Sequence, residues 1–406
     1  MSSHDGLKRL AMVVPEFRAE GKRSGGLDAV AQFVLDSFTA QHGWTVRVAS
    51  PRMSRRAAES RRVLDPRSWH APRQRDAVVE ELPISYFGAD LAELEYFRYQ
   101  PRRGLTAFLD ECDVVLIVAG SPAIVNVARD TRRPVVAQIA TFIEQERQAL
   151  IRQQSGMRRV ARLAMTRIVA GLDERALHIP QVVLVENPHM KDECEKRRVP
   201  VQLIAPGVDC KRFRPGAPGP RPGFILAVGR WLDPRKDVRT LLRAFALARE
   251  LGGIQQTLLL AGLQGPCAND LRLIDALGLE DSVQIRENVP LNELAHLYRS
   301  ADLFATTSTE EGLGIVFLEA MASGTPIVTT ATMGASYALG NACAGQLVDF
   351  GPDLVERFAS VLTEWCQDAA RRHRASAAAR VNVEQRFDAS HAGARFRAIV
   401  DRLLPP

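Results

Sequence analysis

Two periodicities alternate along the chain and predict an α/β protein. Short continuous apolar runs indicate buried strands, and segments with apolar residues at helical spacing follow them. In the first unit, the apolar run 9–15 precedes a polar loop, and Val30, Val34 and Phe38 then fall on one helical face before a second strand. We place the C-cap of that helix at Gly43. Strand, glycine loop, helix and strand in this order build a parallel sheet.

A change in composition divides this alternation in two. Residues 206–223 are rich in proline and glycine, as linkers are. Beyond them the alternation restarts, with strands expected at 224–230, 257–262, 282–287, 302–308 and 326–330 and helices between them. The predicted fold class is therefore α/β, with two Rossmann-like doubly wound domains facing across a cleft. We place these domains at 1–205 and 206–389, and we expect a helix at about 390–406 to pack back on the first.

The bulk composition is that of an ordinary soluble globular protein, with 46% hydrophobic, 25% charged and 6% aromatic residues. The longest apolar stretch, 114–128, is too short to span a bilayer. The N-terminus lacks the features of a signal peptide. Six scattered cysteines show neither a CxxC pair nor metal-ligand spacing. We therefore expect a cytoplasmic protein with no bound metal.

The net charge of +6 is concentrated in two arginine-rich segments, 51–75 and 152–167. Such segments attract nucleic acid, anionic lipid or phosphorylated substrates. For the first segment we favour the simpler interpretation of a solvated basic surface. Neither segment interleaves aromatic residues with the arginines, which argues against a nucleic-acid partner. Peripheral contact with an anionic membrane stays open.

Ligands of open α/β folds bind outside the carboxyl ends of the strands, so candidate chemistry is sought in the loops there. The first such loop ends in Gly25 and Gly26 directly before a helix, where free amides suit an anion. A plain tight turn explains the same pair. The GxGxxG pattern is absent, and no acidic residue stands at the dinucleotide spacing. This disfavours a hydride-transferring Rossmann enzyme.

A second loop, 229–237, carries cations at both rims. Arg230 directly follows a strand, and Lys236 lies just before a helix. A guanidinium and an ammonium so placed suit a diphosphate. A surface loop that is charged only for solubility is the alternative.

The third loop opens the stretch 310–330. Glu311 sits where a helix is expected to start near Ile315, and Gly312 and Gly314 leave backbone amides open. Glu319 lies further along the same helix, among apolar residues, where a carboxylate needs a partner. Two carboxylates and open amides suit a polyol such as a sugar or ribose. The alternative, in which Glu311 only favours the helix dipole and Glu319 is a surface residue, leaves the apolar run unexplained.

Taken together, these residues resemble the C-terminal domain of retaining GT-B glycosyltransferases of family four, the glycosyl transferases group 1. The resemblance is carried by segments 224–245 and 282–330, in which Glu311 and Glu319 match the family's E-x7-E motif. Residues 205–216 resemble its domain junction, and the Gly25–Gly26 pair resembles its glycine loop. The resemblance spans nearly the whole chain and is strong from 206 to 330.

This resemblance implies a nucleotide-diphosphate sugar as donor substrate. Arg230 and Lys236 would hold the diphosphate and neutralise the leaving group, and with Glu311 they would form the catalytic set. Glu319 would bind the ribose, and Gly26, with Gly25, would let the N-terminal loop approach the diphosphate. The donor sugar would be held by Glu311 together with three backbone amides, those of Gly312, Leu313 and Gly314.

The resemblance also implies transfer with retention and without a metal or another cofactor, and the chain has no Asp-x-Asp. The acceptor, a small molecule or a lipid-linked one, would dock between roughly Arg52 and Ile168, at the cytoplasmic face of a membrane if lipid-linked. Two alternatives remain, a nucleotide-sugar epimerase of the same architecture and a non-catalytic partner subunit that binds sugar nucleotide. The oligomeric state and the nucleotide base stay open.

One departure from the family pattern concerns the donor sugar. Family members place a histidine after the strand that residues 134–140 resemble, and here that position is Ala140, with Gln138 and Thr141 beside it. None of the eight histidines is nearby in the sequence. We therefore hypothesise a donor whose terminal hydroxyl is altered or absent, such as a deoxysugar.

Overall fold

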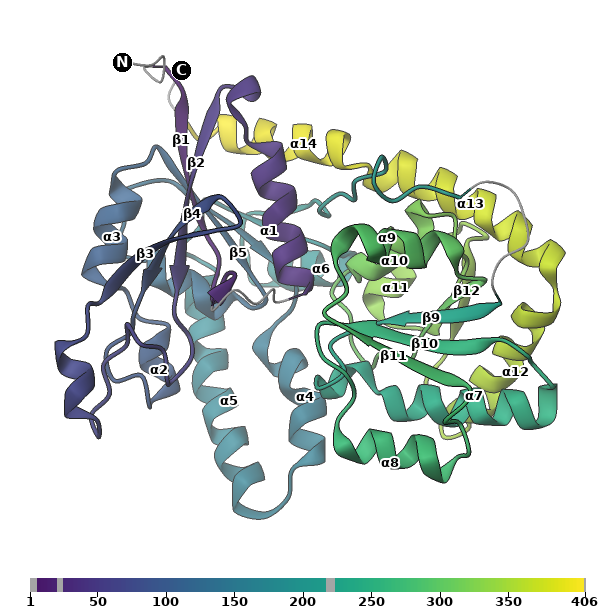
Figure 1. Cartoon of the computed structure of the whole chain (residues 1–406). Coiled ribbons are helices and arrows are strands. Elements are labelled where there is room, and N and C mark those ends of the chain that lie inside the picture. The colour runs from purple at the N-terminus through teal and green to yellow at the C-terminus, as the bar shows by residue number, and fades with distance from the viewer. Residues whose placement is uncertain (1–5, 20–24, 217–222, 405–406) are drawn as a thin grey trace. The chain divides into compact units, whose positions relative to one another are not determined.

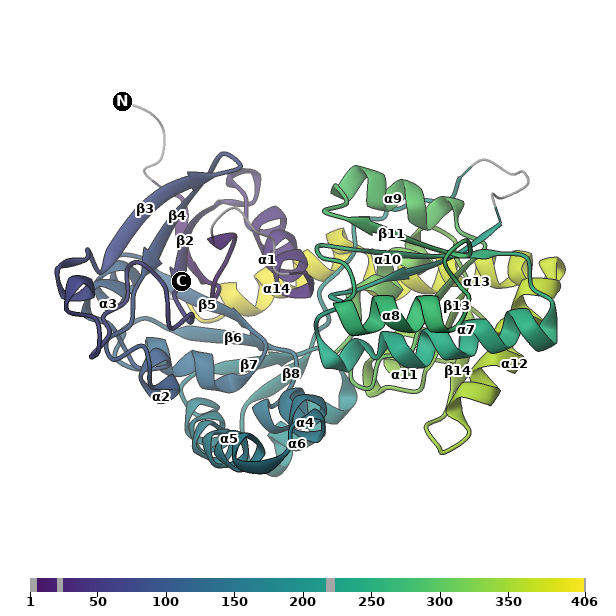
Figure 2. The same cartoon turned by 60° about the horizontal axis from the view of Figure 1, so that its bottom comes forward.

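The computed structural model describes residues 6–19, 25–216 and 223–404 of the 406-residue chain. Contacts between Cα atoms divide it into unit 1, Met1–Pro206 with Ala392–Pro406, and unit 2, Gly207–His391. Each unit is a largely parallel sheet covered by helices (Figures 1 and 2). Within the described ranges, no helix combines the length and apolarity needed to cross a membrane.

The sheet of unit 1 has eight strands among the described residues, in the order β3-β4-β2-β1-β5-β6-β7-β8. Their bounds are β1 Lys8–Val13, β2 Trp44–Pro51, β3 Gln74–Val79, β4 Leu82–Phe87, β5 Val114–Ala119, β6 Val135–Ile139, β7 Val182–Val185 and β8 Val201–Leu203. All neighbouring strands are parallel except β3 and β4, which form an antiparallel hairpin at the edge. The sequence pattern did not predict that hairpin, because β3 is polar and largely exposed.

The helices of unit 1 cover both faces of its sheet. Their bounds are α1 Gly26–Ser37, α2 Glu95–Arg98, α3 Arg103–Asp110, α4 Ile143–Gln153, α5 Gly156–Ala176 and α6 Pro188–Lys196, with α14 Ala389–Asp401 returning from the end of unit 2. Phe396 of α14 packs edge-on against Phe33 of α1. The predicted C-cap at Gly43 is wrong: α1 ends at Ser37, and Gly43 adopts φ 79° after a short 3₁₀ turn.

The sheet of unit 2 has six described strands, all parallel, in the order β11-β10-β9-β12-β13-β14. Their bounds are β9 Phe224–Val228, β10 Thr257–Gly262, β11 Val283–Glu287, β12 Leu303–Thr306, β13 Ile327–Thr330 and β14 Gly345–Val348. This is the doubly wound 3-2-1-4-5-6 order, whose direction reverses between β9 and β12. The predicted fold class, two Rossmann-like α/β domains, is confirmed.

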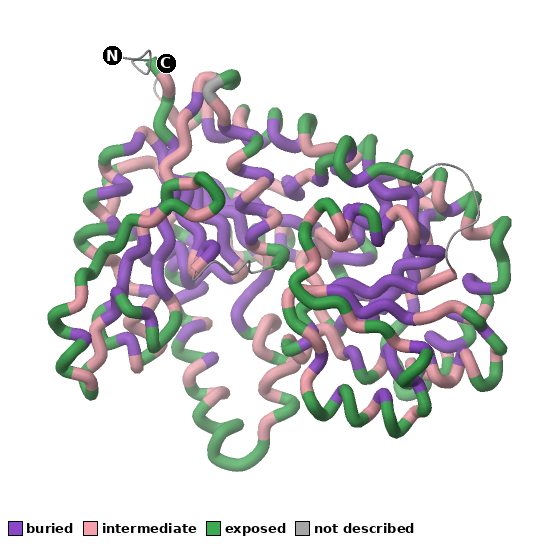
Figure 3. Tube along the Cα trace, in the orientation of Figure 1, coloured by how far each residue is buried: buried purple, intermediate pink, exposed green. Residues whose placement is uncertain are grey.

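Helices also cover both faces of the second sheet. Their bounds are α7 Val238–Gly252, α8 Ala268–Ala276, α9 Leu291–Ser300, α10 Ile315–Ala322, α11 Met333–Leu339, α12 Leu354–Gln367 and α13 Ala369–Phe387. One face packs against α7 and α12, around Phe245 and Phe358. On the other face, the rings of Tyr298, Phe304 and Phe317 contact one another in turn and fix α9 and α10 on the sheet. Figure 3 shows the central strands of both sheets as buried, among them β5 and β6 in unit 1 and β12 and β13 in unit 2.

Candidate functional site

The candidate site lies in unit 2, at the carboxyl ends of β9 and β12. These strands are neighbours at the point where the strand order reverses, so the loops that follow them meet. Two hydrogen bonds join the loops: Thr309 N donates to the Arg235 carbonyl at 2.7 Å, and Thr307 Oγ1 donates to the Asp237 carbonyl at 2.8 Å. The sequence separates these loops by about seventy residues, and the sheet topology brings them together.

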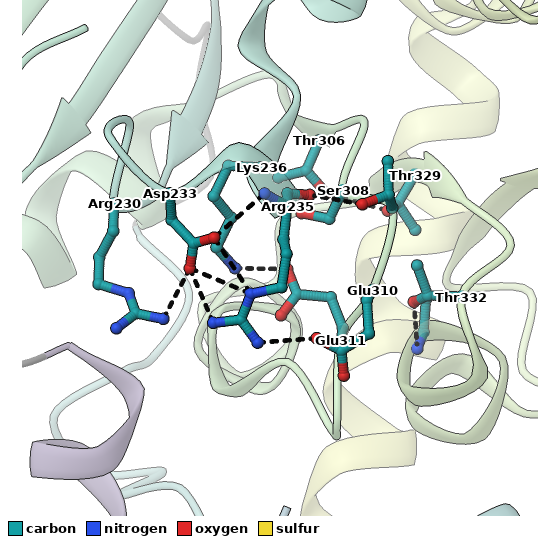
Figure 4. A network of polar contacts seen from close by, with 12 residues as sticks. Arg230, Asp233, Arg235, Lys236, Thr306, Ser308, Glu310, Glu311, Thr329 and Thr332 are labelled. Atoms are coloured by element: carbon teal, nitrogen blue, oxygen red, sulfur yellow. Dashed lines mark hydrogen bonds and ion pairs between the residues drawn. The ribbon is translucent and has the colours of Figure 1, made fainter. Parts of the chain in front are cut away.

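The predicted catalytic residues Lys236 and Glu311 contact each other directly. Lys236 Nζ donates to Glu311 Oε1 at 2.6 Å, and both side chains are at least 85% buried (Figure 4). Arg230 lies on the same rim and donates from Nη2 to Asp233 Oδ2 at 2.9 Å, with its own side chain about half exposed. The structure therefore brings the three predicted residues into one charged network, in which the cations are paired with acids.

Arg235 connects the two halves of this network, and the sequence reasoning missed it. Its guanidinium donates to both carboxylate oxygens of Asp233 and, at 2.8 Å, to Glu310 Oε2 (Figure 4). Burial alone would raise the pKa of Asp233, but the hydrogen bond and charge of Arg235 and the charge of Arg230 outweigh it and lower that pKa to about 2. Asp233 is thus a permanent anion that holds both arginines. The position of Asp233 between Arg230 and Arg235 in the loop is the sequence feature that could have predicted this network.

Helix α10 begins beside this network, as predicted, at Ile315. Gly314 precedes it with φ 76°, and a Cβ there would lie 2.3 Å from a ring carbon of Phe317, so only glycine fits. The amides of Leu313 and Gly314 have no hydrogen-bond partner within the described parts of the chain. Gly312 lies against the next helix, where a Cβ on Gly334 would meet its carbonyl at 2.8 Å. The start of α10 therefore offers donors next to Glu311.

Glu319 is buried inside unit 2, with 7% of its surface exposed. Tyr298 of α9, itself fully buried, donates its hydroxyl to Glu319 Oε2 at 2.8 Å. Burial raises the pKa of Glu319 to about 7, and the tyrosine hydrogen bond opposes that rise only in part. The interpretation of Glu319 as a surface residue is wrong. A carboxylate among apolar residues was expected to need a partner, and that partner is Tyr298. The tyrosine lies on the buried face of α9.

The glycine loop of unit 1 is described only in part. Gly25 is the N-cap of α1 with φ 77°, and Gly26 is the first helical residue, so the pair precedes a helix as predicted. Residues 20–24, which include Ser24 of the glycine motif, lie outside the described residues. A Cβ added at Gly26 would have no atom of the described residues within 4 Å of it.

The carboxyl ends of β6 and β7 in unit 1 carry a second polar cluster. Thr141, next to Ala140, donates its hydroxyl to Gln145 Oε1 at 3.1 Å, and Gln145 Nε2 lies 3.1 Å from His189 Nε2. The expectation that no histidine lies near Ala140 is therefore wrong for the folded protein. His189 is distant in the sequence, but Gln145 links it to Thr141, the residue next to Ala140. The fold brings His189 from the first turn of α6 toward the end of β6.

The first arginine-rich segment, 51–75, is not simply a solvated basic surface. Arg52 is 3% exposed and lies 3.3 Å from Glu16 and 3.8 Å from Glu59, while Arg75 Nε donates to Glu59 at 2.6 Å. Arg52 also stacks near the ring of Tyr86. Part of the positive charge of this segment therefore holds unit 1 together.

The chain resembles known proteins in sequence over part of its length. Residues 211–382 match the family model "Glycosyl transferases group 1". The D-inositol 3-phosphate glycosyltransferase of Frankia alni is 36% identical over 180 residues, 40% of this chain and 44% of that protein. The D-inositol 3-phosphate glycosyltransferase of Thermobispora bispora is 34% identical over 221 residues, which are 50% of this chain and 51% of that protein. The chain thus matches about half or less of the length of these curated relatives.

In structure the likeness extends over the whole chain. Sucrose-phosphate synthase from Thermosynechococcus elongatus has a TM-score of 0.71 at 19% identity and covers 98% of this chain and 99% of its own. HepE of Anabaena in complex with UDP-glucose has a TM-score of 0.67 at 16% identity, with 97% and 99% covered. These likenesses show a shared two-domain α/β fold. The match of residues 211–382 to the glycosyl transferases group 1 model agrees with the family that the sequence motifs resemble.

Proposed function

We propose that this chain is a glycosyltransferase that moves a sugar from a nucleotide-diphosphate sugar to an acceptor hydroxyl. The observation that supports this most is the charged network at the junction of β9 and β12. Arg230 and Lys236 stand beside Glu311 and the unpartnered amides at the start of α10. The two cations suit a diphosphate, and the carboxylate and the backbone amides beside them can accept hydrogen bonds from, and donate them to, sugar hydroxyls. The match to glycosyl transferases group 1 and the glycosyltransferase relatives support the same class.

Donor binding would exchange the partners of Lys236. In the structure, the Lys236 ammonium is neutralised by Glu311 at 2.6 Å. A diphosphate carries more charge than one carboxylate and would draw Lys236 and the half-exposed Arg230 toward it. Glu311 would then be released to accept hydrogen bonds from the donor sugar. Occupation of the diphosphate site thus prepares the sugar site.

We propose that the same cations support transfer without a metal. As the glycosidic bond breaks, negative charge develops on the leaving diphosphate, and Arg230, Lys236 and the N-terminus of α10 would stabilise it. We propose retention of the anomeric configuration by the resemblance to family four. Glu319 would bind the ribose, with Tyr298 holding its carboxylate in place.

A direct test measures nucleotide diphosphate released from UDP-glucose and related donors, with and without a panel of acceptor alcohols and with EDTA. We expect release that depends on acceptor and is insensitive to EDTA, and a product of retained configuration by NMR. Lys236→Met should lower kcat/KM by about 100-fold, whereas Lys211→Met, at an exposed lysine of unit 2, should not. Acceptor-independent formation of an epimerised nucleotide sugar, or binding without turnover, would overturn the proposal in favour of an epimerase or a partner subunit.

The two glutamates should fail in different ways. Glu311→Ala should mainly slow transfer, because it removes the sugar contact, and Glu319→Ala should mainly weaken nucleotide binding. Calorimetric titration with UDP and steady-state kinetics separate the two effects. Glu250→Ala, at an exposed glutamate of α7, is the matched control. Equal and small effects of both substitutions would contradict the donor-binding roles and would indicate that Glu311 and Glu319 are only structural.

For the donor sugar, we propose a terminal position that is altered or deoxygenated. Ala140 offers no side-chain hydrogen bond at the end of β6. Comparing kcat/KM for UDP-glucose and for deoxysugar nucleotides tests this, and we expect the deoxysugar donors to be preferred. Preference for UDP-glucose would contradict it.

We further propose that unit 1 contacts the cytoplasmic face of an anionic membrane through the start of α5. Met157 and Val160 are 88% and 67% exposed there, beside Arg158 and Arg159. Residues 147–172 contain no acidic side chain. Exposed apolar and basic side chains together suit an anionic lipid surface, and each arginine contributes about 1 kcal/mol there.

Vesicle sedimentation tests this membrane contact. Replacing Arg158 and Arg159 with serine should lower partitioning onto vesicles containing phosphatidylglycerol by roughly 30-fold, about 2 kcal/mol. Replacing Arg129 and Arg132, two other exposed arginines of unit 1, should change little. Equal binding to neutral and anionic vesicles would contradict it. Because the acceptor can be lipid-linked or a small molecule, transfer should be measured with both kinds.

A further inference from the structure

Two parallel hydrogen-bonded connections join the end of β6 to the end of β7 in unit 1. In one, Thr141 donates to Gln145, which contacts His189. In the other, Gln138 Nε2 donates to Glu186 Oε1 at 3.3 Å. Because β6 and β7 are parallel neighbours, both connections lie at the carboxyl edge of the sheet, where α/β folds bind ligands.

This cluster is continuous with the point where the strand order of unit 1 reverses. The amides of Ala140 and Thr141 donate to the carbonyl of Gly120 at 3.2 and 2.9 Å. Gly120 directly follows β5, and β5 pairs with both β1 and β6. The residues at the end of β6 are therefore fixed to the loop at the switch point, which is the expected place for a ligand.

A buried polar atom of the cluster, Gln138 Oε1, lacks a partner among the described residues. Gln138 is 1% exposed, and its Oε1 is buried with no hydrogen bond to any described residue. Leaving a buried acceptor unsatisfied costs about 1–3 kcal/mol. Such a group in a native protein needs an explanation, and a ligand or water that completes the site is one. Glu186 and Thr141 beside it are also buried, at 5% and 4% exposure.

His189 supplies the complementary donor. Because Gln145 Oε1 accepts from Thr141, its Nε2 is left to donate to His189 Nε2. In the neutral imidazole the proton is then on Nδ1, which has no hydrogen-bond partner among the described residues, and the side chain is partly exposed. Asn187 caps α6 by accepting from Met190 N at 2.9 Å, which fixes the turn that carries the histidine.

We propose that this cluster, Gln138, Thr141, Gln145, Glu186 and His189, binds the acceptor, with His189 in direct contact with an acceptor hydroxyl. The proposal rests on the proposed glycosyltransferase function and assigns its acceptor site to residues that reach beyond the range 52–168. Gln145 and Thr141 are positioning residues that set the tautomer and orientation of His189.

The chemistry of the cluster also selects a class of acceptor. A hydroxyl group both donates and accepts, so it matches Nδ1–H of His189 and the orphan oxygen of Gln138. The buried side chain of Glu186 accepts a hydrogen bond from Gln138 and holds it in place. The site therefore suits a hydroxyl-bearing acceptor such as a polyol.

The binding test does not depend on transfer. Protein labelled with ¹⁵N-histidine gives imidazole signals, and His189→Asn assigns that of His189. Glucose and glucosamine serve as polyol probes at high millimolar concentration. We expect both to shift the His189 signal. No shift by either probe would overturn the proposal.

Kinetics supply the second arm, with whichever acceptor the enzyme turns over. His189→Ala should raise the acceptor KM at least tenfold and leave UDP binding unchanged, while His178→Asn, at an exposed histidine of unit 1, should have no effect. Thr141→Val should raise the acceptor KM, and Thr141→Ser, which keeps the hydroxyl, should restore it. An unchanged acceptor KM in His189→Ala would refute the acceptor site. Wild-type protein that binds UDP but transfers to no acceptor would instead count against the proposed function.

Discussion

The buried pair of Glu319 and Tyr298 makes the stability of unit 2 depend on pH in a predictable direction. Burial raises the pKa of Glu319 from its ordinary 4.5 to about 7. In the unfolded chain the carboxyl ionises above about 4.5, whereas in the folded protein it keeps its proton until about pH 7. The folded state therefore binds more protons between these values. Stability from this group is fully present below about pH 4.5 and is lost as pH rises through 7.

The size of the effect follows from the two pKa values. One pKa unit corresponds to about 1.4 kcal/mol, so the difference between 4.5 and about 7 is worth about 3 kcal/mol. Because only 7% of Glu319 is exposed, solvent screening reduces this little. Glu319→Gln removes the titration and keeps an acceptor for Tyr298. The variant should thus be about 3 kcal/mol more stable relative to wild type at pH 8 than at pH 4.5.

Native-state hydrogen exchange measured by mass spectrometry can report on unit 2 separately from unit 1. The free energy of opening is obtained from peptides of α10 and β12 at several pH values, after correction for the intrinsic pH dependence of exchange. Comparing the variant with wild type cancels the contribution of all other titrating groups. A difference between the two proteins that stays constant from pH 4.5 to 8 would refute the reasoning.

Three further substitutions test how the sites are held. Gly314→Ala places a Cβ 2.3 Å from the ring of Phe317 at φ 76°, so urea unfolding should show a loss of about 2 kcal/mol. Arg102→Met removes a buried guanidinium that donates to three backbone carbonyls of unit 1, and calorimetry should show a loss of about 2 kcal/mol. Arg235→Met should lower kcat/KM for the donor at least tenfold, and Arg235→Lys should recover only part, because one ammonium cannot replace the fork that holds two carboxylates.

Most strands of unit 2 could be predicted from sequence because β9, β10, β12 and β13 are continuous apolar runs that are largely buried on both faces. Leu258 and Leu259 point to opposite faces of the sheet and both are buried, which is the pattern of a covered parallel strand. The hairpin of β3 and β4 could not be predicted this way. Its strand β3 lies at the sheet edge with mostly exposed side chains, so the pattern carries no signal of burial.

The predicted site residues could be found from the sequence because of where they lie relative to the predicted strands and helices. Arg230, Lys236 and Glu311 stand next to strand ends and helix starts, where local patterns locate them. Tyr298 and His189 lie within helices, and nothing local distinguishes Tyr298 from a core aromatic residue. Only the tertiary fold shows that Tyr298 faces Glu319 and that His189 faces Gln145.

The charged network at β9 and β12 bears on how the proposed donor would bind. Each cation there has a carboxylate partner, so a diphosphate would have to displace Glu311 from Lys236 and would gain only the difference between the two interactions. The attraction lost would be between groups that are mostly buried, and salt would screen it weakly. Under the proposed function, the same exchange would turn Glu311 from a charge partner into an acceptor for the donor sugar. The Lys236–Glu311 pair would therefore lower affinity for the nucleotide alone and couple the sugar contact to occupation of the diphosphate site.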